Sequence, residues 1–248
     1  MMNIIMWIAL FLITGCSTLE KPVLEPLVLK TQTETSSVSD DLIIQHPYFI
    51  LNYNKTHRLA NWVKYTLRNE DLNGPGKRPK KFKPDPLLKK MGIQPVSHDD
   101  YTNSGYNRGH LAPAEDFSKS QEAIDSTFIM SNVIPQKGIV NSGAWAQLEK
   151  KVRSWACGEK VITVITGPVL TSDLSKLKNS DISVPNEFYK IILDETPPLK
   201  LIAFKYNQFE KNQNIIKNKV SFTDVQTQDK LNLSTVKDSE VNDWKTCP

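Results

Sequence analysis

Residues 106–117 read YNRGHLAPAEDF, a stretch that suits neither a long helix nor a long strand. Gly109 and Pro113 flank His110, and both residue types interrupt regular structure. We therefore expect backbone geometry, rather than packing, to fix the direction of the His110 side chain. Reactive side chains are often presented in this way. His110 and nearby Arg108 are accordingly candidate functional residues.

The segments around this stretch carry strand patterns. Polar and apolar residues alternate in NWVKYTL, residues 61–67, which predicts a strand with one buried face. Nearly continuous apolar runs predict further strands whose two faces are both covered. These runs occupy residues 128–134, 161–170, 188–193 and 199–204.

A helix pattern begins near Asn141, in line with an apolar stripe, and a weaker one covers residues 115–125. Glu149 lies on the flank of the stripe, and Arg153 follows one turn later. Helices combined with these strands predict an α+β domain on a mixed or antiparallel sheet. The stripe consists of Trp145, Leu148, Val152 and Trp155.

Positive charge is concentrated in one part of the chain, although the net charge is only +4. From Lys55 to Lys90 there are eleven Lys or Arg residues against three acidic residues. A solvated loop that keeps the protein soluble and a surface for a polyanionic partner both agree with this pattern. The candidate nucleic-acid-binding residues are Arg68, Lys77, Arg78, Lys80, Lys81 and Lys83.

The N-terminus predicts export. Residues 1–15 contain no charged side chain and match the apolar region of a secretory signal, and LITGC then resembles a bacterial lipobox that would lipidate Cys16. Residues 16–45 have the composition of a tether, which leaves 46–248 as the folded domain. An uncleaved anchor helix is the alternative. Both readings place a membrane-attached protein outside the cytoplasm, at the periplasmic side or the cell surface.

Two further cysteines, Cys157 and Cys247, are isolated from each other in the sequence. In an oxidising compartment such a pair can form a disulfide, here one that ties the C-terminal tail to the core. Two free thiols are the alternative. The spacing does not suit a metal site.

Several polar residues fit the chemistry of phosphodiester cleavage. The imidazole of His110 is suited to taking a proton from water near neutral pH, and Arg108 is suited to holding a phosphate. The carbonyl oxygen of Asn141 is a hard ligand suitable for Mg²⁺, and Glu149 can bind the waters of such an ion. The remaining histidines lack motif context and are expected to be structural or exposed. They are His46, His57 and His98.

Three motifs occur in order: NRGHLAPAEDF, SNVIPQ and NSGAWAQLEKKVR. Together they resemble the DNA/RNA non-specific endonuclease family, the sugar-non-specific nucleases with a ββα-metal fold. The resemblance runs from about Tyr53 to residue 170 and continues more weakly to residue 233. Three ordered motifs are far more specific than any one of them.

The resemblance implies roles for individual residues. His110 matches the general base, Asn141 the direct ligand of Mg²⁺ or Mn²⁺, and Glu149 the carboxylate that orients metal-bound water. Asn132 matches an asparagine that supports the site. Arg108 and Arg153 match arginines that contact the phosphate. The implied products carry 5′ phosphates, and the implied substrates are DNA and RNA with weak sequence discrimination.

One position departs from the family pattern. The family usually has Asp before the arginine, whereas this chain has Asn107. Asparagine keeps a hydrogen-bonding oxygen but lacks the charge, so altered rate or pH dependence is expected. Three alternatives remain open: a lipoprotein that captures DNA with weakened catalysis, a structural envelope lipoprotein, and a phosphodiesterase for another substrate class.

Overall fold

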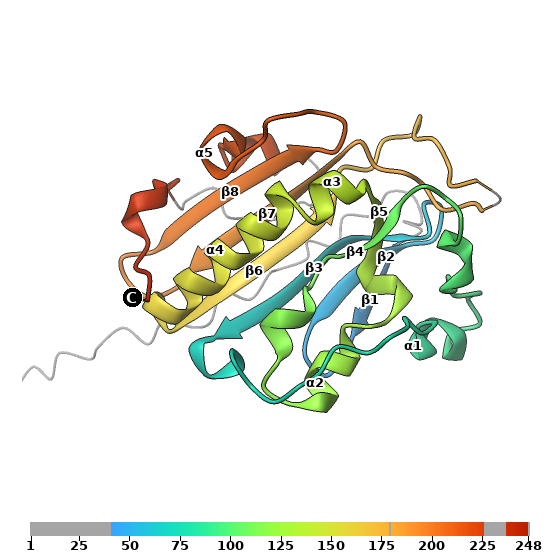
Figure 1. Ribbon diagram of the computed structural model, residues 1–248, viewed down its shortest axis with the longest axis horizontal. Helices are drawn as coiled ribbons and strands as arrows, with labels where there is room; N and C mark the ends of the chain where they lie inside the picture. Colours follow the sequence, from blue (N-terminus) through green and yellow to red (C-terminus); the bar gives the residue numbers. More distant parts are fainter. Residues whose placement is uncertain (1–40, 179, 226–236, 248) are drawn as a thin grey trace, which may run out of the picture. The chain divides into compact units, whose positions relative to one another are not determined.

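The computed structural model describes residues 41–178, 180–225 and 237–247 (Figure 1). These residues belong to one compact unit, Glu34–Pro248. The predicted signal segment, Cys16 and nearly all of the predicted tether lie outside the described residues. None of the helices in the described ranges is long and apolar enough to cross a bilayer.

Among the described residues, seven strands form one sheet in the order β1-β2-β3-β6-β7-β8-β9, and β4 pairs with β5 in a separate hairpin. All of these pairings are antiparallel, which confirms the predicted α+β class. The strands of the large sheet are β1 (Asp41–Gln45), β2 (Ile50–Asn54), β3 (Leu59–Arg68), β6 (Val161–Pro168), β7 (Glu187–Asp194), β8 (Lys200–Asn207) and β9 (Lys219–Val220). The hairpin strands are β4 (Asn107–His110) and β5 (Val133–Gln136).

The helices are short apart from one. The α-helices are α1 (Pro86–Lys90), α2 (Gln121–Ser126), α3 (Gly138–Asn141), α4 (Ala144–Glu159) and α5 (Ile215–Asn218). Short 3₁₀ helices occupy Asn69–Asp71, Asp99–Tyr101, Ala114–Phe117, Met130–Asn132 and Val241–Asp243.

The long helix α4 covers one face of the large sheet (Figure 1). Its four predicted stripe residues are all buried. The Trp145 ring contacts the rings of Phe188 in β7 and Tyr206 in β8, with centroids 4.7 and 5.5 Å apart. The predicted strands at 61–67, 161–170, 188–193 and 199–204 are confirmed as β3, β6, β7 and β8. The core therefore lies between α4 and this sheet face.

The predicted helix beginning near Asn141 is interrupted. Asn141 ends the short helix α3, and α4 begins only at Ala144. The chain is too tightly turned at Gly143 for a side chain, because a Cβ there would lie 2.3 Å from the carbonyl oxygen of Ile139. Asn141 is therefore held in the turn between two helices and does not begin the apolar stripe.

Two other predicted elements are divided. The predicted strand at 128–134 contains a 3₁₀ turn at Met130–Asn132, and β5 begins only at Val133. The predicted helix at 115–125 consists of the 3₁₀ helix Ala114–Phe117 followed by α2. Ser120 separates them, because its side chain accepts a hydrogen bond from the N–H of Ala123 and starts a new helix.

A disulfide joins Cys157 in α4 to Cys247 near the C-terminus. It closes a segment of 90 residues. The tail runs close to α4, since a Cβ on Gly158 would lie 2.4 Å from the carbonyl group of Lys245. Trp244 packs on Trp155 with ring centroids 5.4 Å apart. The tail is thus fixed to α4 by a covalent bond and by packing.

Replacing Cys247 with serine is expected to lower the free energy of unfolding by about 2–4 kcal/mol, since the open chain gains conformational freedom when unfolded. Urea unfolding of unreduced protein measures this change. Reduction of the parent should add two reactive thiols to the count. An equally stable variant would show that the bridge does not stabilise the fold.

Candidate active site

The NRGH stretch forms β4, the first strand of the hairpin. His110 pairs with Val133 and Asn107 pairs with Gln136 across it. A Cβ on Gly109 would lie 2.0 Å from Oε1 of Gln136, so a larger residue here would have to displace the buried Gln136 side chain. The hairpin pairing holds the backbone of His110. Packing against aromatic rings also directs its side chain, in contrast to the expectation from the sequence.

Two aromatic rings enclose His110. Its ring centroid lies 4.8 Å from that of Phe82 and 4.9 Å from that of Phe128. Only 8% of the residue is exposed, and Nε2 is buried without a hydrogen-bond partner among the described residues. A buried polar atom without a partner costs roughly 1–3 kcal/mol. Such an atom needs an explanation beyond stability, and catalysis is one.

The surroundings of His110 keep its imidazole neutral. The pKa of His110 falls from 6.5 to about 3, mainly because of burial and to a lesser extent because of the nearby Arg78 guanidinium, while Glu115 opposes the shift. A positively charged ring is disfavoured in this apolar environment. At neutral pH the ring therefore has a free lone pair that can accept a proton.

This shift predicts a pH-dependent stability. The unfolded chain binds a proton at His110 below about pH 6.5, whereas the folded chain resists protonation down to about pH 3. Stability due to this group is therefore present above pH 6.5 and lost as the pH falls towards 3, by about 2 kcal/mol at pH 5. Urea unfolding of the parent and His110→Ala at pH 7 and pH 5 measures it. The parent should lose more stability than the variant, and equal losses would contradict the shift.

Asn132 fixes the chain that follows His110. It is fully buried, and its side chain binds both the N–H and the carbonyl group of Ala112, each at 2.9 Å. It also donates to the carbonyl oxygen of Thr127 at 3.0 Å. Asn132 therefore holds the chain that follows β4 against the segment that leads into β5.

Arg78 lies near His110, which the sequence did not indicate. It forms an ion pair with Glu115, and its guanidinium lies 5.6 Å from the ring centroid of Phe128. Phe128 is one of the two rings that contact His110. Sequence reasoning placed Arg78 only in the basic loop. No motif marked it, because its neighbours in the site come from distant segments.

Arg78 and Glu115 line a cavity of about 570 Å³ together with Lys150 and Arg153 of α4. Neither His110 nor Asn141 lines this cavity. All six predicted nucleic-acid-binding residues are exposed. Only Arg78 of the six lines this cavity, and Arg68 lines a different one.

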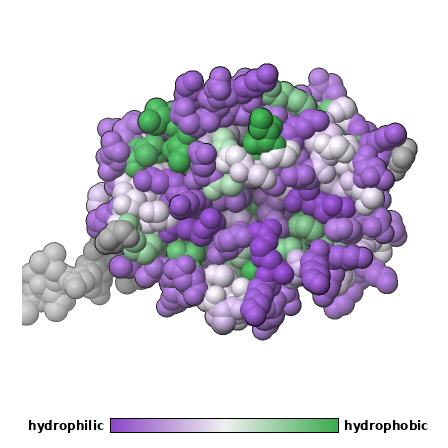
Figure 2. All heavy atoms as spheres, in the orientation of Figure 1, coloured by the Kyte–Doolittle hydropathy of each residue, from purple (hydrophilic) through white to green (hydrophobic). Residues whose placement is uncertain are grey.

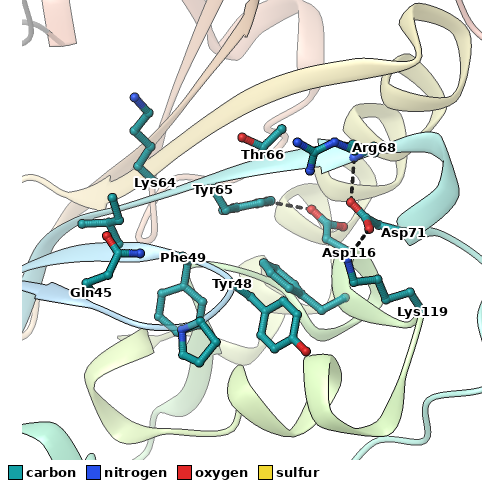
Figure 3. Close-up of a pocket in the computed structure, with 13 residues that line it drawn as sticks. Gln45, Tyr48, Phe49, Lys64, Tyr65, Thr66, Arg68, Asp71, Asp116 and Lys119 are labelled. Atoms are coloured by element: carbon teal, nitrogen blue, oxygen red, sulfur yellow. Dashed lines mark hydrogen bonds and ion pairs between the residues drawn. The ribbon is translucent and has the colours of Figure 1, made fainter. Parts of the chain in front are cut away.

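Arg153 is held by a buried carboxylate. Its Nη1 lies 3.0 Å from Oδ1 of Asp116, while the Tyr65 hydroxyl donates to Oδ2 of the same group at 2.7 Å. Figure 3 shows the Tyr65 side chain pointing at Asp116. The neighbouring Asp116 carboxylate raises the pKa of Arg153 although burial opposes it. Arg153 is thus a permanently charged group in a fixed position.

Glu149 lies half-buried on α4, one turn before Arg153. Burial raises the pKa of Glu149, and the positive charge of Lys190 opposes this effect. Lys190 is fully buried in β7 and donates to Thr166 at 2.6 Å. Burial in turn lowers the pKa of Lys190, while Glu149 raises it. The helix and the sheet therefore contribute opposite charges to one interior cluster.

Asn141 ends α3, beside the hairpin in Figure 1. A Cβ on Gly138, in the same short helix, would lie 3.3 Å from Nδ2 of Asn107 in β4. Within the described ranges the Asn141 side chain makes no hydrogen bond, and no three His, Cys, Asp or Glu residues form a metal cluster. A single free carboxamide oxygen fits an ion that keeps most of its waters.

Arg108 forms hydrogen bonds with the loop that contains His98. Its Nε and Nη2 atoms donate to the carbonyl oxygen of His98, at 3.2 and 2.6 Å, and its guanidinium lies 5.7 Å from the Tyr101 ring centroid. The structure thus gives Arg108 a role in holding the 98–102 segment, and its predicted phosphate contact stays a prediction. Among the other histidines, His46 pairs with Asp85 at 3.1 Å.

The comparisons with known proteins identify the family. The model of the DNA/RNA non-specific endonuclease family matches residues 29–239. The chain belongs to this family. Nuclease C1 of Cunninghamella echinulata var. echinulata is 31% identical over 218 residues, which are 79% of this chain and 86% of that protein. The resemblance inferred from the three motifs is confirmed.

Mitochondrial relatives match a shorter region. The mitochondrial nuclease EXOG of Danio rerio is 34% identical over 160 residues, covering 60% of this chain and 46% of that protein. Human mitochondrial endonuclease G is 35% identical, covering 59% and 52%. The chain thus spans about half the length of these relatives.

A solved structure has the same fold. It is a crystal structure of a complex of EndoG with EndoGI, described as showing the mechanism of EndoG inhibition. The match has a TM-score of 0.68 and 26% sequence identity, and covers 79% of this chain and 89% of the other. The present chain and the chain in that complex therefore share one fold.

Proposed function

We propose that this protein is a Mg²⁺-dependent endonuclease that hydrolyses phosphodiester bonds of DNA and RNA and leaves 5′ phosphates. The observation that carries the proposal is the neutral, partnerless His110, held on a rigid hairpin and subject to the charges of Arg78 and Glu115. Membership of the endonuclease family supports the substrate class.

In this proposal His110 acts as the general base. It takes a proton from the attacking water, whose oxygen bonds to phosphorus as the bond to the 3′ oxygen breaks. The 3′ oxygen leaves with the charge and is protonated by solvent. The negative charge of a bound phosphodiester would raise the low pKa of His110, since an opposite charge favours the protonated ring. The ring then becomes a stronger base when substrate is present.

Arg78 and Arg153 supply positive charge at the phosphate. Arg153 is fixed by Asp116, so it needs little reorganisation to meet a developing negative charge. Arg78 is exposed and paired with Glu115, and a phosphate would compete with that carboxylate for the guanidinium. The two arginines would therefore differ in role, with Arg153 preorganised and Arg78 recruited by substrate.

Asn141 would hold the Mg²⁺ ion, or Mn²⁺ in its place, and Glu149 would accept hydrogen bonds from waters of the ion. When bound, the ion supplies charge stabilisation to the phosphate and the leaving oxygen. His110 activates the water, so a second metal is not needed. The carboxamide of Asn141 suits this task because it is neutral and makes no hydrogen bond with any residue that the structure describes.

The chemistry involves the phosphate and no base, so weak sequence discrimination is expected. The exposed basic residues between Lys55 and Lys90 would add attraction to any nucleic acid backbone. Counterion release makes such attraction fall steeply with salt. Cleavage should therefore be strongly inhibited as the salt concentration rises.

Incubation of the protein with supercoiled plasmid and with RNA, each with Mg²⁺ and with EDTA, tests the function. Cleavage of both substrates only with Mg²⁺ supports it. Equal cleavage in EDTA would remove the metal from the mechanism. Binding without cleavage would favour a DNA-capturing lipoprotein weakened by Asn107, and cleavage of small diesters alone would favour another phosphodiesterase.

The location of the protein is also a proposal. The sequence features that support it are the uncharged residues 1–15 and the LITGC stretch, which together predict a bacterial lipoprotein acylated at Cys16. The tether predicted for residues 16–45 is too long, because residues 41–45 form strand β1 of the large sheet. Mass spectrometry of the mature N-terminus tests the acylation. A mature chain that begins before Cys16, or an unmodified Cys16, would contradict lipidation.

A further inference from the structure

A second cavity, of about 410 Å³, lies at one edge of β3 (Figure 3). Pairing between β2 and β3 stops at Ile50 and Lys64, because the chain before Ile50 turns back at His46–Phe49. Within the described sheet β3 continues to Arg68 with β6 on its other side only. This break in the sheet opens the cavity.

Two of the cations that line this cavity have no ion-pair partner in the described part of the chain. Neither the Lys64 ammonium nor the Arg68 guanidinium makes an ion pair or a side-chain hydrogen bond with any residue that the structure describes. Lys119, the third cation, lies 2.8 Å from Oδ1 of Asp71. Figure 3 shows Lys64 and Arg68 extending from the same strand. Among the described residues, none neutralises the positive charge of these two side chains beside the cavity.

The two acidic groups at the cavity are already satisfied. Asp71 accepts from Lys119 through Oδ1 and from the backbone N–H of Arg68 through Oδ2, at 2.8 and 3.0 Å. Asp116 accepts from Arg153 and Tyr65. These carboxylates are bound to other groups and do not neutralise Lys64 or Arg68.

Aromatic groups form the other wall. Tyr48 is half-buried, and its ring centroid lies 5.6 Å from Nζ of Lys119. Phe49 and Phe117 are buried beneath it, with ring centroids 6.2 Å apart. A cavity of this volume, with an aromatic wall and a few placed cations, falls in the size range of small-molecule sites. Flat rings beside cations suit a nucleobase with its phosphate.

We propose that this cavity is a second nucleotide-binding site, in which Lys64 and Arg68 hold a phosphate and Tyr48 contacts the base. His110, Asn141 and Arg153 do not line this cavity, although its lining residue Asp116 binds Arg153. The identity of the ligand rests on the proposed function, since a nuclease meets nucleotides as substrate and as product. The proposed source of the phosphate is a free 5′-mononucleotide, and a longer strand is the alternative that the test distinguishes.

Binding measurements on the full chain test this site without cleavage. Isothermal titration of His110→Ala protein in EDTA would use adenosine 5′-monophosphate, adenosine, inorganic phosphate and a single-stranded 12-mer. We expect the mononucleotide to bind. Adding Lys64→Ala and Arg68→Ala should weaken its affinity roughly tenfold or more, because two charged contacts are lost. Adding Lys211→Ala and Lys217→Ala is the matched control and should change nothing, because both residues are exposed and neither lines the cavity.

The outcomes separate the possibilities. Equal mononucleotide affinity with and without the Lys64 and Arg68 substitutions would overturn the proposal, as would inorganic phosphate binding as tightly as the mononucleotide. If the 12-mer alone responds to these substitutions, the source is a strand, and the proposed free mononucleotide is wrong. Because no cleavage is measured, a failed plasmid test would leave these results unaffected. Unchanged unfolding midpoints would exclude a folding defect.

Discussion

Replacing His110 with alanine is expected to slow plasmid cleavage in Mg²⁺ by a factor of about 10²–10⁴, the usual contribution of a positioned acid or base. Alanine removes the proton acceptor but leaves the hairpin pairing and the Asn132 contacts in place. The site keeps its arginines and its carboxamide, so binding of nucleic acid should change much less than the rate. Initial rates of supercoil loss, with binding measured in EDTA, separate the two effects.

His57→Ala provides the matched control. His57 hydrogen-bonds Ser183 at 2.8 Å, far along the chain from the hairpin, and has no part in the proposed chemistry. Its substitution should leave the cleavage rate within about twofold, since no charge or contact in the site changes. Circular dichroism and the unfolding midpoint show whether either variant is misfolded. A folded His110→Ala protein that cuts as fast as the parent would rule out His110 as the base.

The sheet was predictable because its strands carry their own signals. Strands β6, β7 and β8 are buried on both faces, so each has a nearly continuous apolar run in the sequence. The stripe of α4 was equally clear. The divided elements were harder, because they depend on contacts with distant residues. Asn132, for example, bends an apolar run into a 3₁₀ turn through its bonds to Ala112 and Thr127.

The site was predictable only where a motif marks it. His110, Asn141, Glu149 and Arg153 belong to ordered motifs, whereas Arg78 lies in a basic loop among other lysines and arginines. Its pairing with Glu115 joins residues 37 positions apart. No local pattern distinguishes it from its neighbours, which are equally charged and exposed.

The interior charges were hidden for a related reason. Lys190 appears in the sequence as one polar residue within the strand FYKIIL, and Asp116 as part of a loop. Both are buried. Their partners lie on α4, where Glu149 interacts with Lys190 and Arg153 pairs with Asp116. The sequence alone does not show that these residues meet. Arg108 shows the opposite case, because this motif residue also binds the carbonyl oxygen of His98, a contact that no sequence pattern indicated.

Replacing Asn141 with alanine is expected to lower Mg²⁺-dependent turnover at least as much as the loss of His110, by about 10²–10⁴ or more. Asn141 is half-buried at the end of α3, and its side chain contributes no hydrogen bond to the described fold, so stability should be nearly unchanged. The loss should therefore come from weaker metal binding. Cleavage rates across a Mg²⁺ titration measure it.

Asn141→Asp is the informative companion, because aspartate keeps an oxygen ligand at the same position while adding a charge. It should recover part of the turnover and shift the Mg²⁺ dependence, which a purely structural asparagine would not do. Ser142→Ala, next in the chain and exposed, should behave like the parent. If Asn141→Ala cleaves plasmid with the parental rate and Mg²⁺ dependence, the ion is held elsewhere, and the hairpin and α3 do not form one catalytic centre.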